Sequence, residues 1–446
     1  MSEAADIAAA RLSAEELAAN FADAHPPLTP DEARVEADRC YFCHDAPCVE
    51  ACPTGIDIPG FIRKIATGNL KGSATTILQA NILGGSCARV CPTEILCEQA
   101  CVRTAQEDRP IRIGALQRYA TDWLFARGIQ PFARAEPTGR HVAVIGAGPA
   151  GLACAHRLAV AGYEVTIFEA RHKPGGLNEY GVAAYKLVDG FAEREVEFVL
   201  GIGGIRIEYG KSLGRDLTLD ALRREYDAVF LGLGQAGVNA LGVEGEGTFG
   251  GVRNALEFIA ELRQATDLSQ IVVGRRVVVI GGGNTAIDAA SQSRRLGAED
   301  VTIVYRRGPR DMPATRKEQA WAQTCGVRIR HWLAPVRLEA SGGNVSAVVF
   351  ARMRMGAHGK LLVTDELVSI PADMVLKAVG QRFSADPLQG AAPEIASGCI
   401  VVDADRQTSI PGVFAGGDCV AGPDLTVHAV QDGKIAADAI DQMLRR

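Results

Sequence analysis

Cysteine is the residue type whose number and spacing in this chain point most directly to chemistry. Eight of the twelve cysteines lie between Cys40 and Cys101. Thiolates are soft ligands that select zinc or iron–sulfur clusters. Short Cys spacings that end in Cys-Pro are typical of [4Fe–4S] ligation, and Cys52 and Cys91 are each followed by proline. We therefore predict that this region carries [4Fe–4S] clusters and transfers electrons.

Spacing alone leaves alternatives open in this region. Zinc is one of them, although structural zinc sites prefer paired C-x₂₋₄-C knuckles. Cys87, four residues before Cys91, and His44, inside the first block, have spacings that would let either bind metal. The other cysteines are scattered singly, and we interpret them as core or incidental because free cysteine is commonly buried. They are Cys154, Cys325, Cys399 and Cys419.

A glycine-rich turn follows the apolar run at residues 142–145 and precedes a helical pattern. A strand, a G-x-G-x-x-G turn and a helix in this order form a dinucleotide-binding fingerprint. Gly146 would make the tight turn, Gly148 would let a pyrophosphate approach the helix N-terminus, and Gly151 would pack the helix on the strand. Glu169 ends the next apolar run and is placed to bind a ribose hydroxyl.

A second fingerprint follows residues 277–280, and its turn and helix start contain Gly281, Gly283, Asn284, Thr285 and Ala286. Its second strand, expected at residues 301–305, is followed by Arg306 and Arg307, where NAD-specific folds place an acidic residue. Two guanidinium groups can hold a 2′-phosphate bidentately. We therefore expect NADP(H), with NAD(H) possible. The alternative is that the arginines form a solvated basic turn.

These motifs require elements that position them. Two βαβ units imply two parallel-sheet dinucleotide domains, and helical apolar spacing at residues 13–24 and 59–83 implies a helical N-terminal region. A strand-and-glycine segment at 412–418 and a helix from about Val427 should return to complete the first nucleotide domain. The expected fold class is α/β, with two Rossmann-like domains after an α-helical iron–sulfur domain. The expected domains are 1–135 (iron–sulfur), 136–250 and 373–446 (FAD-binding, first and second parts) and 251–372 (NAD(P)H-binding), with a linker at 130–138.

Composition excludes several classes of protein. Charged residues make up 22% of the chain and the net charge is −6, whereas nucleic-acid binding normally leaves a basic footprint. Residues 1–16 lack the apolar segment of a signal peptide, and no uninterrupted run of 18 apolar residues predicts a membrane span. We expect a cytoplasmic protein, where thiols stay reduced and cysteines serve as metal or redox ligands rather than as a disulfide framework.

Over nearly its whole length the chain resembles the FAD-containing subunit of bacterial NAD(P)-dependent dihydropyrimidine dehydrogenase, and equally the N-terminal half of the single-chain animal enzyme. From Cys40, the string Cys-x₂-Cys-x-Asp-Ala-Pro-Cys-x₃-Cys-Pro-Thr and its continuation Ile-Asp-Ile-Pro-x-Phe-Ile look like that family's opening signature. So does Cys-x₃-Cys-Pro-Thr-x₃-Cys-x₃-Cys from Cys87. Pro-Gly-Gly-Leu after Glu169 and Ala-Gly-Gly-Asp ending at Asp418 are familiar in two-dinucleotide flavoprotein reductases, where the first site holds FAD.

The resemblance implies ligand sets that spacing does not supply. One [4Fe–4S] cluster would be held by Cys40, Cys43, Cys48 and Cys101. The other would be held by Cys52, Cys91, Cys97 and a glutamine, for which Gln117 is the candidate because residues 110–117 resemble the segment that carries this ligand. Cys87 has a counterpart in the family but is not expected to bind.

The resemblance also implies nucleotide contacts. FAD would lie against residues 148–152, 169–177 and 418–426, with Lys186 at a position where the family can carry Arg near the flavin, and Lys211 also approaching it. NADPH would contact residues 283–286, Arg306, Arg307 and residues 378–380. The candidate cofactor-binding residues not yet named are Pro149, Ala150, Leu152, Gly175, Gly176, Leu177, Ala378, Gly380, Gly417 and Thr426.

The implied activity is electron input. Electrons from NAD(P)H would enter FAD and leave through two [4Fe–4S] clusters, and no catalytic acid or base is expected because the cofactors carry the chemistry. The chain shows no (β/α)₈ run and no ferredoxin-like extension. A partner subunit in a hetero-oligomer would therefore supply FMN, ferredoxin-like clusters and the site where uracil or thymine is reduced to the 5,6-dihydro form.

Two rival functions remain. The small subunit of NADPH-dependent glutamate synthase has the same domain order, but the Asp-Ala-Pro-Cys string and the six-residue step from Cys91 to Cys97 favour the pyrimidine family. A non-catalytic iron–sulfur scaffold or redox sensor would have degenerate nucleotide sites, whereas both fingerprints here are intact. Flavin bleaching on addition of NADPH would separate an enzyme from a scaffold.

Overall fold

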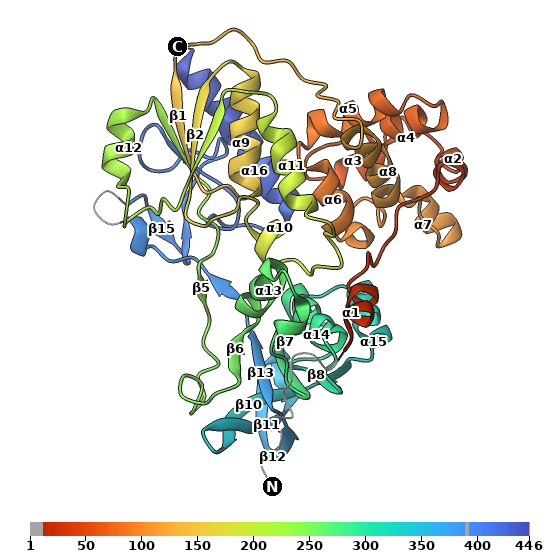
Figure 1. Cartoon of the computed structure of the whole chain (residues 1–446), viewed down its shortest axis with the longest axis vertical. Coiled ribbons are helices and arrows are strands. Elements are labelled where there is room, and N and C mark those ends of the chain that lie inside the picture. Colours follow the sequence, from red (N-terminus) through yellow and green to blue (C-terminus); the bar gives the residue numbers. More distant parts are fainter. Residues whose placement is uncertain (1–11, 389–391, 446) are drawn as a thin grey trace. The chain divides into compact units, whose positions relative to one another are not determined.

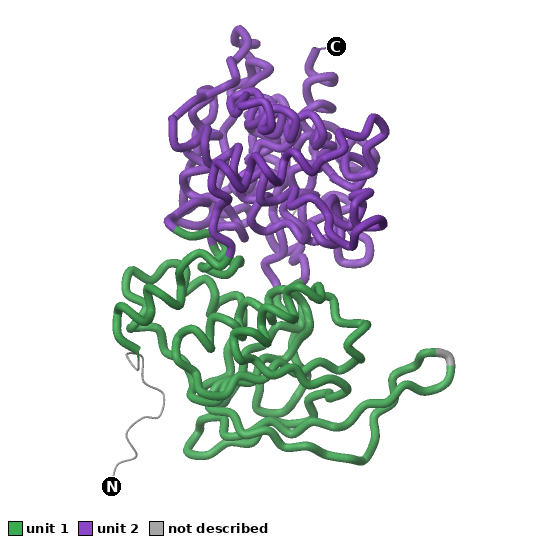
Figure 2. Tube along the Cα trace, turned by 90° about the vertical axis from the view of Figure 1, so that its right-hand side faces the viewer, with its two compact units in different colours: residues 1–24, 180–188, 238–381 green, residues 25–179, 189–237, 382–446 purple. Residues whose placement is uncertain are grey.

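The computed structural model describes residues 12–388 and 392–445. The chain forms two compact units, coloured separately in Figure 2. Unit 1 comprises residues 1–24, 180–188 and 238–381, and unit 2 comprises residues 25–179, 189–237 and 382–446. The prediction that residues 1–16 are not a signal peptide falls mostly outside the described residues, because the description begins at residue 12. No helix in the described ranges is both long and apolar enough to cross a membrane.

The cysteine-rich part of unit 2 is helical, as expected. Its apolar stretch at 59–83 forms separate helices, because Gly68 adopts a left-handed φ of 79° and the Asn69 side chain then caps a new helix by accepting from Gly72 N. The helices are α2 (Pro30–Asp38), α3 (Pro47–Glu50), α4 (Ile58–Ala66), α5 (Leu70–Ala80), α6 (Gly84–Val90), α7 (Val102–Glu107) and α8 (Ile113–Phe125), with a 3₁₀ turn at Thr93–Ile95.

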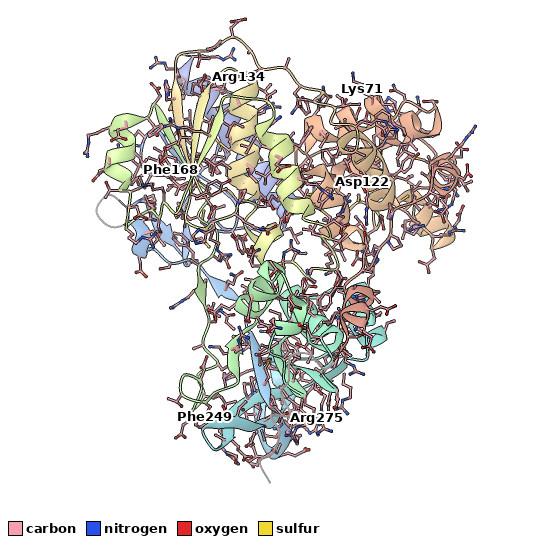
Figure 3. All side chains as sticks on the ribbon, in the orientation of Figure 1. Lys71, Asp122, Arg134, Phe168, Phe249 and Arg275 are labelled. Atoms are coloured by element: carbon pink, nitrogen blue, oxygen red, sulfur yellow. The ribbon has the colours of Figure 1, made fainter. Side chains whose placement is uncertain are left out.

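The rest of unit 2 is built on a five-stranded parallel sheet in the order β17-β4-β1-β2-β3. Helices α9 and α16 cover one face of this sheet and α12 lies on the other (Figure 1). Alternate residues of β1 face opposite sides: Val142 and Val144 pack with α9 and α16, while Ala143 and Ile145 pack with α12. Phe168 on β2 lies in the second of these cores (Figure 3). The elements are β1 (His141–Ile145), α9 (Pro149–Val160), β2 (Glu164–Glu169), α10 (Leu177–Tyr180), α11 (Phe191–Leu200), β3 (Ile205–Tyr209), α12 (Leu219–Glu225), β4 (Ala228–Leu231), β17 (Val413–Ala415) and α16 (Thr426–Leu444).

Unit 1 contains the second parallel sheet, in the order β6-β13-β7-β8-β9. Val277 and Val279 of β7 face the helices, and Val278 and Ile280 face an antiparallel sheet, β10-β11-β12. The elements are α1 (Ala14–Asn20), β6 (Val252–Asn254), α13 (Ala255–Gln264), β7 (Arg276–Gly281), α14 (Asn284–Arg295), β8 (Asp300–Tyr305), α15 (Arg316–Thr324), β9 (Arg328–His331), β10 (Leu333–Ser341), β11 (Asn344–Met355), β12 (Leu361–Pro371) and β13 (Met374–Ala378).

Short strands complete the described chain. They pair as β5 (Gly237–Val238) with β14 (Gln381–Arg382) and as β15 (Ile395–Ala396) with β16 (Cys399–Ile400). The expected fold class, α/β with two Rossmann-like sheets and a helical N-terminal region, is confirmed. The return of the C-terminal segment to the first sheet is also confirmed, because β17 pairs with β4 in parallel register.

Candidate functional site

Four thiols line one cavity in the helical part of unit 2. Cys40 follows α2, Cys43 lies in the next loop, Cys48 is on α3, and Cys101 precedes α7. Its apolar wall is formed by Ile58, Pro59 and Ile62 of α4 and by Ile113 at the start of α8. These thiols are the four that the family resemblance assigns to one cluster, so the structure brings that set together. We name this hollow cavity 1.

A second cavity in the same unit is lined by Cys52, Cys91, Cys97 and Gln117. This is the second ligand set that the resemblance implies. Cys87, which is buried, and Val427, at the start of α16, also line it. The hollow is named cavity 2. Its wall therefore includes residues of both the helical region and the C-terminal segment.

The donor chemistry of cavity 1 fits a polynuclear iron site. Burial and the neighbouring thiols Cys101 and Cys40 raise the pKa of Cys48 to about 12, and burial likewise raises the pKa of Cys40. A group of buried thiols can stay deprotonated only beside compensating positive charge, which cluster iron supplies. Within the described ranges, no group of three His, Cys, Asp or Glu side chains is arranged to hold a single metal ion. His44 is exposed and does not line cavity 1.

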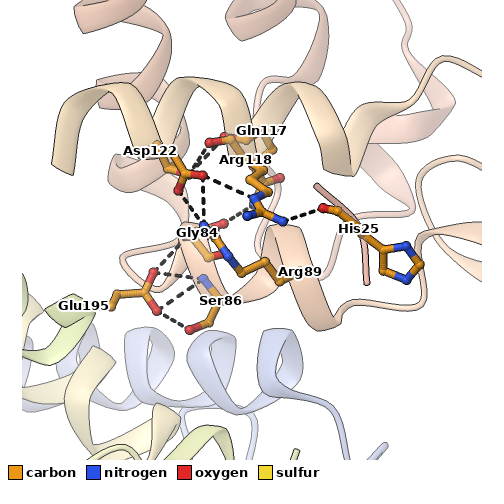
Figure 4. A network of polar contacts seen from close by, with 10 residues as sticks. His25, Gly84, Ser86, Arg89, Gln117, Arg118, Asp122 and Glu195 are labelled. Carbon is orange, nitrogen blue, oxygen red and sulfur yellow. Dashed lines mark hydrogen bonds and ion pairs between the residues drawn. The ribbon is translucent and has the colours of Figure 1, made fainter. Parts of the chain in front are cut away.

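Gln117 is oriented by a hydrogen bond to the start of α6 (Figure 4). Its side chain is buried, and Nε2 donates to the Gly84 carbonyl at 2.7 Å. The amide oxygen is thus left as the ligand atom of this side chain. The start of α6 is held in turn by Glu195 of α11, whose carboxylate accepts from Gly85 N at 2.8 Å and Ser86 N at 3.0 Å. Burial raises the pKa of Glu195 to about 7, although Ser86 and Arg89 oppose the shift.

The first glycine fingerprint has the geometry of a pyrophosphate site. Gly146 adopts φ 101°, and a Cβ there would lie 2.3 Å from the Gly232 carbonyl oxygen, so only glycine fits. Gly148 precedes α9 as its N-cap and makes no side-chain cap, which leaves the helix N-terminus open to an anion. Gly176 approaches the same turn, since its Cβ would lie 2.8 Å from Gly148 Cα.

The other FAD candidates in unit 2 gather around that turn. The Glu169 carboxylate is buried at the end of β2 and accepts from Ala147 N at 2.8 Å. Gly175 N donates to the Ala147 carbonyl, and Thr426 Oγ1 bonds Asn178 Oδ1 at 2.8 Å. This second bond joins the start of α16 to α10, which begins at Leu177. The structure therefore places the sequence-predicted set in one location.

Asp418 places a half-buried carboxyl group beside the first glycine fingerprint in unit 2. Burial and the carboxylates of Asp424 and Asp432 raise its pKa to about 6. Among the described residues its side chain accepts no hydrogen bond, while Gly417 N donates to Asp432 at 2.9 Å. A carboxyl group with unused acceptor capacity suits a hydroxyl-bearing ligand such as the ribityl chain of a flavin.

The second fingerprint, in unit 1, repeats the open helix N-terminus. Gly283 is the N-cap of α14, and a Cβ placed there would meet no heavy atom within 4 Å. Ala378 ends β13 directly beside Gly281, and Gly380 follows with φ 93°. The helix that begins at Asn284 carries Thr285 and Ala286 in its first turn. This arrangement can bind a pyrophosphate at the carboxyl edge of the sheet.

The two arginines after β8 are exposed. Neither the Arg306 nor the Arg307 side chain forms an ion pair or hydrogen bond with another described residue. Both guanidinium groups therefore remain available to an anion. No carboxylate occupies the end of β8, which stops at Tyr305.

The two candidate lysines have different surroundings. Lys186 belongs to unit 1 and is buried there, with Nζ 2.8 Å from both Asp288 and Glu318. Its positive charge is therefore paired with two carboxylates of unit 1. Lys211 is exposed in unit 2, and its backbone N–H donates to the Glu169 carbonyl at 3.0 Å, beside the expected ribose position.

Comparison with known proteins agrees with this geometry. A family model described as pyridine nucleotide-disulphide oxidoreductase matches residues 140–433. The chain belongs to the pyridine nucleotide-disulphide oxidoreductase family. The match makes the protein an oxidoreductase that uses FAD and NAD(P)H. A second model, described as dihydropyrimidine dehydrogenase domain II, 4Fe-4S cluster, matches residues 17–129 and indicates iron–sulfur binding there.

Curated relatives cover nearly the whole chain. It is 37% identical to the NAD-dependent dihydropyrimidine dehydrogenase subunit PreT of Salmonella typhimurium, over 94% of this chain and 96% of that protein. It is also 37% identical to the glutamate synthase [NADPH] small chain of Escherichia coli, over 94% of this chain and 93% of that protein. The family resemblance inferred from the sequence is confirmed.

Solved structures support the fold. The Mycobacterium tuberculosis protein FprA, in complex with NADPH, superposes with a TM-score of 0.59 at 20% identity, covering 70% of this chain and 85% of that one. A thioredoxin reductase from T. acidophilum gives a TM-score of 0.55 at 23% identity, over 69% of this chain and 100% of that one.

Sequence reasoning missed several residues that shape these sites. Asn178 and Asp432 fix the flavin-side turns, and Glu195 fixes the start of α6. They contact partners 15 to 248 positions away in sequence, and none belongs to a short motif. Only the expectation that buried polar side chains need hydrogen-bond partners could have drawn attention to them.

Proposed function

We propose that this chain is the electron-input subunit of an NAD(P)-dependent dihydropyrimidine dehydrogenase, an oxidoreductase that acts on a CH–CH bond. The observation that carries the proposal is the pair of cavities in unit 2, each lined by its own set of four expected ligands. The similarity to PreT over 94% of the chain supports the same assignment. The proposed cofactors are FAD, NADP(H) or NAD(H), and two [4Fe–4S] clusters.

The residues of the chain bind and orient these groups. In unit 2 the N-terminus of α9 and Glu169 would hold the adenosine and pyrophosphate of FAD, and Asp418 would accept from the flavin's side chain. In unit 1 the N-terminus of α14 would hold the nicotinamide dinucleotide. FAD, when bound, converts the two-electron donor NAD(P)H into a source of single electrons for the clusters. The protein then needs no acid or base catalyst of its own.

NADP(H) is the proposed preferred nucleotide. The support is the exposed, unengaged pair Arg306 and Arg307 at the end of β8, where an acidic residue would favour NAD. The relatives divide on this point, since PreT is named NAD-dependent and the glutamate synthase chain is named for NADPH. The arginine pair is therefore the feature to test.

The proposed partner is an FMN-containing subunit with ferredoxin-like clusters that reduces uracil or thymine. Relatives named as subunits or chains of larger enzymes support a hetero-oligomer. The sequence-based domain division, with residues 1–135 as the iron–sulfur domain, 136–250 and 373–446 for FAD and 251–372 for NAD(P)H, is part of the proposal. So is a cytoplasmic location, supported by twelve cysteines that are all free.

Reconstitution tests the proposal. The full chain should be combined anaerobically with a candidate FMN-containing, pyrimidine-reducing subunit, and NADPH and NADH oxidation should be followed with and without uracil. Uracil-dependent oxidation that yields dihydrouracil is expected. The main rival function is glutamate synthase, because the chain is 37% identical to the small chain of that enzyme. NADPH oxidation that instead requires glutamine, 2-oxoglutarate and a glutamate synthase large subunit would refute the proposal and favour this rival.

A further inference from the structure

A lysine from the C-terminal helix reaches the iron–sulfur region within unit 2. Lys434 lies on α16, two turns after Val427, which lines cavity 2. Its Nζ donates to the Ala80 carbonyl at 2.6 Å and to the Thr54 carbonyl at 3.1 Å. Both acceptors adjoin the wall of cavity 2, because Asn81 follows Ala80, Pro53 precedes Thr54, and both Asn81 and Pro53 line that cavity.

The ammonium group and one proposed cluster ligand, Cys52, both contact Thr54. Thr54 follows Cys52 by two residues, and its Oγ1 lies 3.4 Å from Cys52 Sγ. Lys434 is half-buried, and burial together with Arg157 lowers its pKa, because Asp438 and Cys52 oppose that shift only in part. Keeping a cation among carbonyl groups has a cost, which the two hydrogen bonds offset.

No described carboxylate forms an ion pair with Lys434. On the next turn of α16, Asp438 pairs with Arg157 at 2.8 Å. On the preceding side, Asp432 pairs with Arg406 at 2.7 Å. The positive charge of Lys434 is therefore not cancelled by either acidic neighbour on its own helix.

We propose that Lys434 tunes the cluster at cavity 2, raising its reduction potential so that it accepts electrons from the flavin more readily. A cluster gains one negative charge on reduction, and a fixed cation nearby favours that state. Helix α16 belongs to the proposed flavin-binding segment, yet its Lys434 contacts the cysteine-rich region. This residue therefore joins the two parts of unit 2 between which electrons would pass. The inference rests on the proposed cluster held by Cys52, Cys91, Cys97 and Gln117.

The test is a potentiometric titration of the anaerobically purified full chain, followed by EPR and visible absorption. The cavity 2 signal is the one that Gln117→Ala alters. Lys434→Met should lower its midpoint, so that the ratio of reduced to oxidised cluster at a fixed potential falls on the order of tenfold, which is about 59 mV for one electron. Lys434→Arg should retain the wild-type midpoint because it retains the charge.

Controls separate charge from packing. Lys71→Met removes an exposed charge from α5 (Figure 3) and should leave both midpoints unchanged, since solvent and salt screen it. If the Lys434→Met variant loses its iron, the midpoint should be measured in Lys434→Gln, which keeps a hydrogen-bond donor but not the charge. That midpoint should also be lower than in the wild type. A cluster that retains its iron but no longer reduces in the same window counts as the lowered midpoint.

An unchanged or raised midpoint in the charge-removing variants would overturn the inference. So would an equal shift in Lys434→Arg, because that would make the effect one of shape. Wild-type protein without iron–sulfur clusters would instead refute the proposed function, and that failure is visible in the iron content before any titration begins.

Discussion

Lys186 offers a sharp test of what a buried charge does in unit 1. Its Nζ lies 2.8 Å from Asp288 and 2.8 Å from Glu318, and the side chains of Lys186 and Asp288 are only 7% and 6% exposed. Burial lowers the pKa of Lys186, but Asp288, Glu318 and Tyr185 outweigh it and raise the pKa. The ammonium is therefore charged in the folded protein at any neutral pH.

Lys186→Met should destabilise unit 1 strongly. Removing one partner of a buried ion pair leaves an uncompensated charge and typically costs about 3–5 kcal/mol. Glu318 is 22% exposed, so water relieves part of the cost and the lower end of that range is expected. For a unit of this size, 3 kcal/mol corresponds to a fall in Tm of roughly 6–12 °C.

The assay is thermal unfolding followed by tryptophan fluorescence, since Trp321 lies 5.9 Å from the Tyr185 ring. The matched control is Arg275→Met, which removes an exposed ion pair with Glu299 and should cost less than about 1 kcal/mol. The wild-type contribution of Lys186 is present below its unfolded pKa and is lost only as pH rises through the raised folded value. It should therefore be constant across roughly neutral pH, from about 5 to about 8.

The penalty should be measured at about pH 5 and at about pH 8. A Tm within about 2 °C of wild type, at both pH values, would refute the reasoning. Loss of FAD from an otherwise stable variant would instead favour the flavin contact that the family resemblance implies for Lys186.

Three further outcomes are expected. Arg306→Ala with Arg307→Ala should weaken apparent NADPH affinity about ten- to hundredfold, since charge-assisted hydrogen bonds contribute roughly 1.5–3 kcal/mol each, and should leave NADH little affected; a wild type that already prefers NADH by kcat/KM would show this interpretation to be wrong. Gln117→Ala should change the EPR signal or potential of one cluster at near-normal FAD content, and unchanged spectra would exclude Gln117 as a ligand. Burial raises the pKa of Glu195 from 4.5 to about 7, so stability should fall as pH rises through that window, by up to about 3 kcal/mol. Glu195→Gln should flatten that dependence in denaturant titrations, and an unchanged slope would argue against it.

Local patterns in the sequence were enough to predict the two sheets. Apolar runs such as residues 142–145 are buried on both faces, as parallel strands are, and the glycines that follow them have conformations that only their lack of a side chain permits. The grouping of cluster ligands was predicted by family resemblance and not by spacing. Cys101 lies far from Cys40 in sequence, yet both line cavity 1.

Other features depend on contacts that no local pattern encodes. The antiparallel sheet β10–β12 covers one face of β7 through Val278 and Ile280, but its strands lack a motif that would have predicted their position. Lys186 follows the flavin-side segment in sequence, yet its charge is held by Asp288 and Glu318 of unit 1. Such pairings become visible only when distant segments are brought together.

We propose that this chain alone carries electrons from a nicotinamide nucleotide through FAD to iron–sulfur clusters. The most direct test is an anaerobic titration of the purified full chain with NADPH, and separately with NADH, followed by visible absorption and EPR. Loss of flavin absorption together with the appearance of a reduced-cluster EPR signal, without any partner subunit, is predicted for at least one nucleotide. Bound flavin that neither nucleotide bleaches, or bleached flavin beside clusters that stay oxidised at a potential where dithionite reduces them, would contradict it.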